Sequence, residues 1–180
     1  MRKKQGKRVC ISQESSIFAV AMQSDKLLNI NLAQASEAAE RLHIELTDRF
    51  FADLEQEEIS GGDIHVEIFV KASAGDIYNV NIKADGHVIV ACDRCLDPLD
   101  IEVETSDTLK VKDADPEDCD APEMLYLEAG NQCYDFSWLV YEIIETALPM
   151  QRVHPEGLCN KEMLSYITAE ENGDEDDWDN

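Results

Sequence analysis

Residues 64–70, Ile-His-Val-Glu-Ile-Phe-Val, decide the fold class, because aliphatic side chains recur at every second position from Ile64 to Val70. Side chains two residues apart lie on the same face of a β-strand, so this alternation predicts a strand with one buried face. A turn is expected at residues 73–76, where Gly75 can adopt the positive φ angles that many turns need.

The alternation continues on the C-terminal side of this strand. Apolar and polar residues alternate over residues 78–82, 88–92 and 101–111. The dipeptide Asp85-Gly86 lies between the first two stretches and is typical of a two-residue hairpin turn. Together these stretches predict an antiparallel meander with one buried face.

The N-terminal side adds two shorter strands and a helix. Residues 27–32 and 42–46 are rich in apolar side chains, and we expect each to form a strand. Thr47 or Asp48 can then cap a short helix that ends near Leu54.

The C-terminal part of the chain is mainly helical in pattern. A long helix is predicted over residues 138–148, which Pro149 would end, and a short helix from Asn160 to Tyr166. A short strand is expected at residues 124–127. The sequence lacks the regular succession of strand, helix and strand that would indicate a parallel sheet. The predicted fold class is therefore α+β, an antiparallel β-meander sheet covered by one long and two short helices.

The chain is strongly acidic, with 15 Lys and Arg against 39 Asp and Glu among 180 residues and a formal charge of −24. Residues 11–168 alone keep 32 acids and 10 bases, so the acidity belongs to the body as well as to the ends. Such a charge repels phosphates and anionic lipids, which excludes broad nucleic-acid or membrane-surface binding. No run of about 18 apolar residues predicts a membrane-spanning helix.

Composition divides the chain into three parts. Residues 1–22 begin with five bases and no acid in the first ten positions. We expect a basic arm that is either disordered or mis-started, that is, translated from upstream of the true start. Polar residues interrupt the segment that would follow in a signal peptide, so we expect a cytoplasmic protein. Residues 23–168 are predicted to form one α+β domain, in which residues 113–123 form an exposed acidic loop. Residues 169–180 hold seven acids and no base and predict a disordered acidic tail.

The strongest candidate site begins at Cys92-Asp93-Arg94-Cys95. Two cysteines separated by two residues let two thiolates converge on one ion from a tight turn. A redox pair is disfavoured, because such a pair usually opens a helix whose N-terminus lowers the thiol pKa. Here the pair follows a predicted strand and precedes Pro98.

A second candidate pair lies downstream, in His154-Pro155-Glu156-Gly157-Leu158-Cys159. Cys92, Cys95, His154 and Cys159 together make a Cys3His set, which is a common donor set for structural zinc and leaves no open position for catalysis. The fold would have to bring the two pairs together. Spacing alone leaves two interpretations open: a structural zinc site, or reduced thiols beside a surface histidine.

Other reactive side chains have no paired spacing, and no role is expected for them: Cys10, Cys119, Cys133, His43, His65 and His87. In a reducing cytoplasm we expect free thiols or a metal site rather than disulfides. The chain has no glycine-rich phosphate loop, no G-x-S-x-G motif and no H-E-x-x-H motif. We therefore do not expect an enzyme, and no small-molecule substrate is evident.

The sequence around the first cysteine pair resembles a known family. Residues 92–100, Cys-Asp-Arg-Cys-Leu-Asp-Pro-Leu-Asp after an alternating strand pair, are similar to the widespread bacterial YceD-like family, long described as a domain of unknown function. Residues 134–138 at the helix start, 147–150 at its end and 157–160 beyond it agree with this resemblance. The similarity covers roughly residues 27–167.

The resemblance also bears on the candidate metal ligands. Cys92, Cys95 and Cys159 match the cysteines of the family. Many relatives have further cysteines downstream of the helix, whereas this chain has only Cys159, with His154 nearby. The identity of the fourth ligand, and the retention of metal in this chain, therefore stay open at this point.

The resemblance implies metal binding, nucleic-acid binding and a link to the accumulation of large-subunit ribosomal RNA. Combined with the acidic body, it predicts a non-enzymatic factor in large-subunit assembly that binds a basic ribosomal protein or a pre-ribosomal particle. One alternative is an RNA-binding, metal-containing module, which would need a basic face and for which Arg94 offers only limited RNA contact. A further alternative is a small metal-dependent enzyme.

Overall fold

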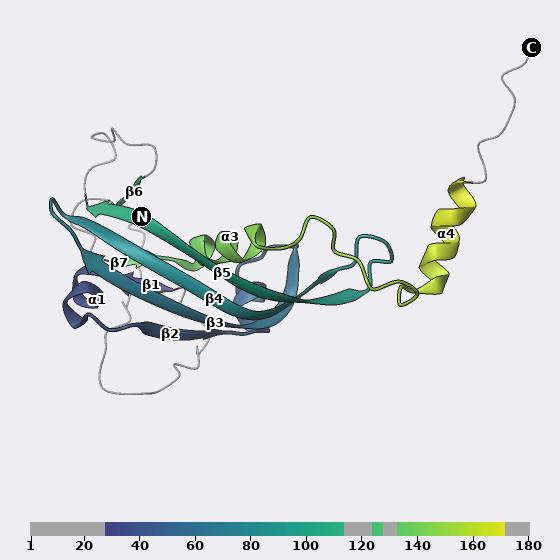
Figure 1. Ribbon diagram of the computed structural model, residues 1–180, viewed down its shortest axis with the longest axis horizontal. Helices are drawn as coiled ribbons and strands as arrows, with labels where there is room; N and C mark the ends of the chain where they lie inside the picture. Colours follow the sequence, from purple (N-terminus) through teal and green to yellow (C-terminus); the bar gives the residue numbers. More distant parts are fainter. Residues whose placement is uncertain (1–27, 114–123, 128–132, 172–180) are drawn as a thin grey trace, which may run out of the picture.

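The computed structural model describes residues 28–113, 124–127 and 133–171. It shows a five-stranded sheet in the order β2-β3-β4-β5-β6 and a two-stranded sheet of β1 and β7, together with helices (Figure 1). The predicted α+β class is therefore confirmed.

The described elements have the following bounds: β1 (Asn29–Asn31), α1 (Leu32–Ala38), β2 (Leu42–Leu46), α2 (Asp48–Asp53), β3 (Ile59–Ala72), β4 (Ile77–Ala91), β5 (Pro98–Asp113), β6 (Met124–Leu127), β7 (Cys133–Asp135), α3 (Ser137–Thr146) and α4 (Lys161–Glu171).

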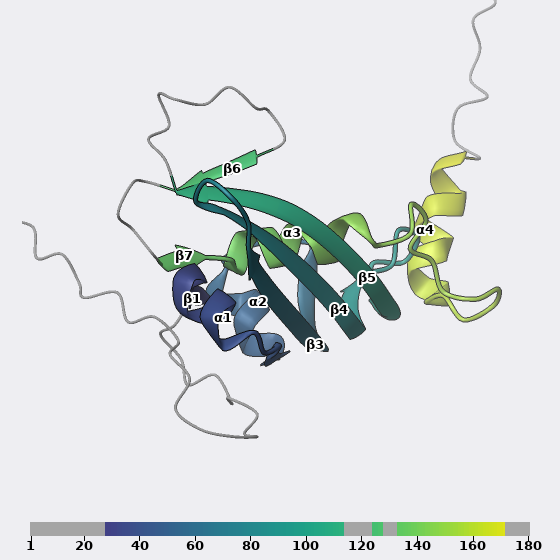
Figure 2. The same ribbon diagram turned by 60° about the vertical axis from the view of Figure 1, so that its left-hand side comes forward.

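Three long strands, β3, β4 and β5, form the centre of the main sheet and curve along their length (Figure 2). The alternating residues of β3 point inward: Ile64, Val66 and Ile68 are completely buried. Strands β2 to β5 pair antiparallel in chain order, but β6 pairs parallel with β5, Lys110 opposite Met124. The sheet is thus mixed, and the expectation of a purely antiparallel meander is corrected at this edge.

The predicted hairpin turn at Asp85-Gly86 is wrong. Strand β4 continues through both residues, and Gly86 pairs with Ile64 of β3 and Val103 of β5. The glycine is needed for another reason: its φ is +149°, and a Cβ atom there would collide with the backbone of Asp63 and Ile64. Only a residue without a side chain allows this approach of two strands.

The substitution Gly86→Ala should therefore destabilise the protein by roughly 2–4 kcal/mol, because it adds both a disfavoured φ and a backbone collision. Gly75→Ala is the matched control. Gly75 also has a positive φ, +77°, but a Cβ atom there meets nothing within 4 Å, and we expect a smaller loss of about 1 kcal/mol. Urea unfolding of both variants measures the difference, and equal losses would contradict the packing argument.

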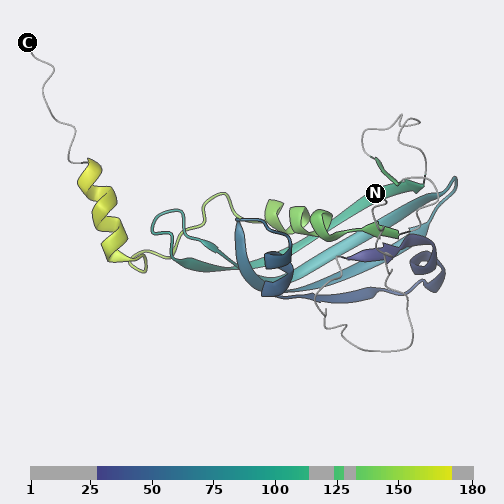
Figure 3. The same ribbon diagram turned by 180° about the vertical axis from the view of Figure 1, so that it is seen from behind.

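The helices α1, α2 and α3 cover the inner face of the sheet (Figures 1 and 3). Val140 and Ile144 of α3 are completely buried in the main core. The start of α3 is fixed by the segment before β1, because the backbone N–H of Leu28 donates to Ser137 Oγ at 2.7 Å and the N–H of Phe136 donates to the carbonyl of Leu28 at 2.9 Å.

Helix α1 begins at Leu32, the last residue of the predicted first strand, of which β1 keeps residues 29–31. Asn31 accepts a hydrogen bond at its side-chain oxygen from the N–H of Gln34, 3.0 Å away, and so caps α1 directly after the short strand β1. The expectation of one long and two short helices is corrected, because four helices lie among the described residues. Helix α4 is as long as α3 and runs past Tyr166, the predicted end.

The predicted basic arm at residues 1–22 lies outside the described residues, as do residues 114–123 of the acidic loop and the acidic tail after Glu171. No helix in the described part of the chain is long and apolar enough to cross a membrane.

Candidate metal centre and acidic face

The turn between β4 and β5 presents the first cysteine pair. The N–H of Leu96 donates to the carbonyl of Cys92 at 2.9 Å, and the N–H of Cys92 donates to the carbonyl of Asp97 at 3.0 Å. Leu96 adopts a positive φ of +62°, which closes the turn tightly. Cys92 is completely buried and Cys95 is 1% exposed, so both thiols point away from solvent.

The segment after α3 docks against this turn. The N–H of Asp93 donates to the carbonyl of Arg152 at 2.7 Å, and the N–H of Arg152 donates back to the Asp93 carboxylate at 2.7 Å. The guanidinium of Arg152 also donates to Glu58, with Nη1 and Oε2 2.9 Å apart. This two-way contact positions His154 and Cys159 beside the first pair.

All four candidate ligand atoms lie within 4.8 Å of one another. The Sγ atoms of Cys92 and Cys159 are 4.0 Å apart, and Cys95 Sγ is 3.4 Å from His154 Nδ1. A tetrahedral zinc ion with ordinary Zn–S and Zn–N bond lengths separates two sulfurs by about 3.8 Å and a sulfur from a nitrogen by about 3.5 Å. The donors present therefore fit one tetrahedral ion.

The orientation of His154 suits a metal ligand. Its Nε2 lies 3.1 Å from the carbonyl of Pro98, which can only accept a hydrogen bond. In the neutral ring the proton therefore sits on Nε2, and Nδ1 faces the thiols with its lone pair. Such a carbonyl contact behind a ligating histidine is a usual feature of metal sites.

The backbone also favours a thiolate at the centre. Burial raises the pKa of Cys92, but the backbone N–H groups of Arg94, Cys95 and His154 lower it to about 6. Burial, followed by the neighbouring thiols, raises the pKa of Cys159. The contact with Cys92 raises the pKa of His154. Cys92 is thus more ready to ligate than Cys159, because a metal binds the thiolate form.

The cysteine cluster has its own small core, which Leu99 joins to the main one. Leu99 and Val153 pack against it, together with Met163 and Leu164 of α4. Asn160 accepts from the N–H of Glu162 at 3.0 Å and so caps α4 directly after the last cysteine. Helix α4 projects from this end of the molecule (Figure 1), and the cluster connects it to the body.

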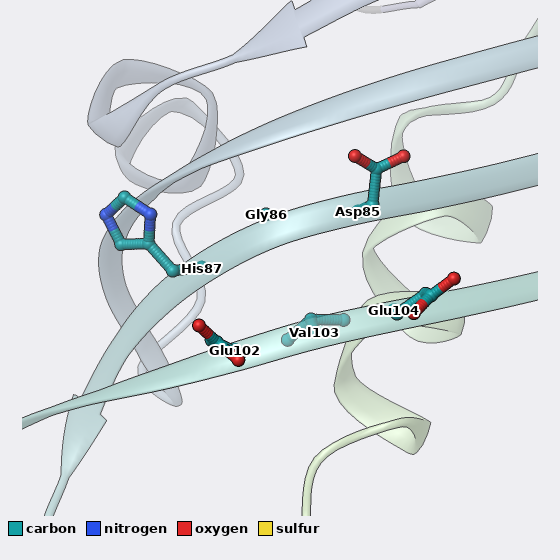
Figure 4. A pocket seen from close by; sticks show the side chains of 6 residues that line it. All are labelled: Asp85, Gly86, His87, Glu102, Val103 and Glu104. Carbon is teal, nitrogen blue, oxygen red and sulfur yellow. The ribbon is translucent and has the colours of Figure 1, made fainter.

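Seven carboxylates gather on the solvent-facing side of the main sheet, which we call the acidic face. They come from four adjacent strands: Glu45, Asp63, Glu67, Asp85, Asp100, Glu102 and Glu104. Register places Asp85 opposite Glu104 and His87 opposite Glu102. Figure 4 shows these four side chains around a shallow hollow over the backbone of Gly86.

A family model described as "Large ribosomal RNA subunit accumulation protein YceD" matches residues 80–180. The chain belongs to the YceD family. The matched residues include all four members of the Cys3His cluster and the whole of β5. No curated protein and no solved structure matches the chain.

The structure also places the remaining cysteines and histidines of this YceD chain, apart from Cys10 and Cys119, which lie outside the described residues. Cys133 is disulfide-bonded, so the expectation of a free thiol there is wrong. His87 lies 3.8 Å from Asp100. His43 and His65, for which the sequence predicts no role, lie in contact with Glu67. Only strand register brings these last three residues together, and residue spacing carries no such signal.

Proposed function

We propose that this YceD-family protein is a non-enzymatic cytoplasmic factor that supports the accumulation of large-subunit ribosomal RNA during ribosome assembly. It does so by binding a basic ribosomal protein, alone or within a pre-ribosomal particle. The observation that carries this proposal is the acidic face, which offers a broad anionic surface on four adjacent strands. The family description supports the ribosomal setting.

The electrostatics of the acidic face favour a basic protein over RNA. Carboxylates on neighbouring strands repel phosphate and attract clustered Lys and Arg. Nearby cations are already engaged: Arg41 contacts Glu67 at 3.0 Å, and Lys83 lies 3.8 Å from Asp85. A basic partner would relieve the repulsion that remains among the carboxylates.

The opposite end of the same sheet face gives the RNA-binding alternative its best support. Lys71 and Lys110 flank Asn79 across β3, β4 and β5, and Lys112 pairs with Ile77. These lysines could contact a few phosphates. They are too few for extensive RNA binding, so we assign them at most a limited contact within a particle.

Zinc in the Cys3His cluster has a structural role in this proposal. Cys92, Cys95, His154 and Cys159 would hold the ion with four protein donors, which leaves no coordination position for a substrate. The ion would hold the turn between β4 and β5, the segment after α3 and the start of α4 together. The closed donor set is also the reason why we favour a binding factor over a metal-dependent enzyme.

A pull-down with the tagged full chain at low salt tests the partner class. We expect basic large-subunit ribosomal proteins to be retained after nuclease treatment and released as salt rises, because long-range charge attraction is screened. The control is the same chain with Glu102→Lys and Glu104→Lys. The RNA-binding alternative predicts a different result. Ribosomal RNA would be retained before nuclease treatment, and neither RNA nor a basic protein would be retained after it.

A further inference from the structure

We propose that His43, His65 and Glu67 form a second metal site, a solvent-facing site for a divalent transition-metal ion on β2 and β3. It is separate from the Cys3His cluster and uses only nitrogen and oxygen donors. The site arises from register. His43 pairs with Glu67, and Glu45 pairs with His65, so the four side chains form two adjacent rows on the outer face of the sheet.

The three ligand atoms lie within 4.0 Å of one another. His43 Nδ1 and His65 Nε2 are 3.2 Å apart, and Glu67 Oε1 lies 3.6 Å from the first and 4.0 Å from the second. Two imidazole nitrogens bound to one ion at ordinary Zn–N distances are separated by about 2.9–3.4 Å. The two histidines thus already stand at the spacing that a shared ion requires.

A second carboxylate orients His65. Its Nδ1 lies 2.7 Å from Glu45 Oε1, and an ionised carboxylate can only accept a hydrogen bond. In the neutral ring the Nδ1 atom therefore carries the proton, and Nε2 presents its lone pair towards His43 and Glu67. This carboxylate–histidine arrangement is the usual support of a metal-binding imidazole.

Glu67 is oriented as well. Its Oε2 accepts from Arg41 Nη1 at 3.0 Å, and the same guanidinium lies over the ring of Phe69, 5.8 Å from the centroid. Arg41 thereby holds one carboxylate oxygen and leaves Oε1 facing the histidines. The rings of His43 and His65 stack with centroids 5.3 Å apart, so both imidazoles have defined planes.

The donor set indicates the class of ion. Two imidazoles and one carboxylate suit Zn²⁺, Co²⁺, Ni²⁺ or Cu²⁺, whereas Mg²⁺ and Ca²⁺ prefer oxygen ligands alone. The His43 side chain is 53% exposed and that of Glu67 is 25% exposed, so an ion can enter from solvent. Three protein donors leave further positions for water or for a side chain of a partner on the acidic face.

The test is a Co²⁺ titration of the full chain after it has been loaded with one equivalent of Zn²⁺, read by visible absorption. We expect one further Co²⁺ to bind with d–d bands and without the thiolate charge-transfer band that cobalt in the cysteine cluster would show. His65→Ala and Glu67→Gln should each weaken this binding by roughly tenfold or more, since loss of even an outer partner of a ligand costs about that much.

His87→Ala is the matched control, because His87 is also an outer-face strand histidine beside a carboxylate. It should bind the second Co²⁺ as the unsubstituted chain does. Circular dichroism confirms that each variant is folded. The proposal is overturned if the zinc-loaded chain takes up no second ion, if His65→Ala binds it unchanged, or if His87→Ala loses it equally. None of these results bears on the binding of a basic protein.

Discussion

The substitution Cys92→Ser should release α4 from the body while the five-stranded sheet stays folded. Structural zinc contributes on the order of 10 kcal/mol to the folded state of small zinc domains. If zinc fills the Cys3His cluster, its loss removes the main support for Met163 and Leu164, which pack against the cysteines. The main core contains none of these residues, so it should not unfold with them.

Hydrogen exchange followed by mass spectrometry measures this release. In the Cys92→Ser variant the amides of α4 should exchange at close to the rate of an unfolded peptide, and those of β3 and β4 should stay protected. Arg94→Ala is the control, since Arg94 is exposed in the same turn and its backbone N–H survives the change. Full protection of α4 in a variant that has lost its zinc would show that the ion does not hold this helix.

Charge reversal on the acidic face should have the largest effect on binding. The double substitution Glu102→Lys with Glu104→Lys places two cations where the outer face now has carboxylates opposite His87 and Asp85. Association with a basic large-subunit protein should slow by roughly tenfold or more at low salt, because surface charge mainly sets the association rate. Stopped-flow or surface-based kinetics at two salt concentrations measures it.

A variant with the same change in net charge separates local from overall electrostatics. Glu37→Lys with Glu57→Lys alters two exposed acids outside the acidic face. This control should slow association far less than the outer-face variant. If both variants slow association equally, only the total charge matters and the acidic face is not the binding surface.

Local patterns predicted most of the main sheet. Alternation located β2 and the three long strands, because a sheet with one buried face imposes period two on its residues. It failed at Gly86, since Asp-Gly is typical of a turn, whereas here the glycine allows β3 and β4 to approach closely. It also failed at Leu32. Asn31 caps α1 there, so a helix begins inside an apolar run whose pattern is typical of a strand.

The sequence alone predicted one of the two clusters of potential ligands but not the other. The C-x2-C motif and the Cys3His chemistry suggested a common site for Cys92 and Cys159, and the structure places them together although they are 67 positions apart. Zinc binding there stays a prediction. The juxtaposition of His43, His65 and Glu67 depends on how β2 pairs with β3. The alternation predicts that these side chains share the outer face, but not which residue of β2 lies opposite which residue of β3.

The ratio of large- to small-subunit ribosomal RNA after deletion of the encoding gene tests the central claim most directly. We predict that deletion lowers large-subunit RNA relative to small-subunit RNA. The unsubstituted protein and the Glu37→Lys, Glu57→Lys variant should restore the ratio, whereas the Glu102→Lys, Glu104→Lys variant at equal abundance should not. An unchanged ratio after deletion would contradict the proposed function, and full rescue by the outer-face variant would contradict the role of the acidic face.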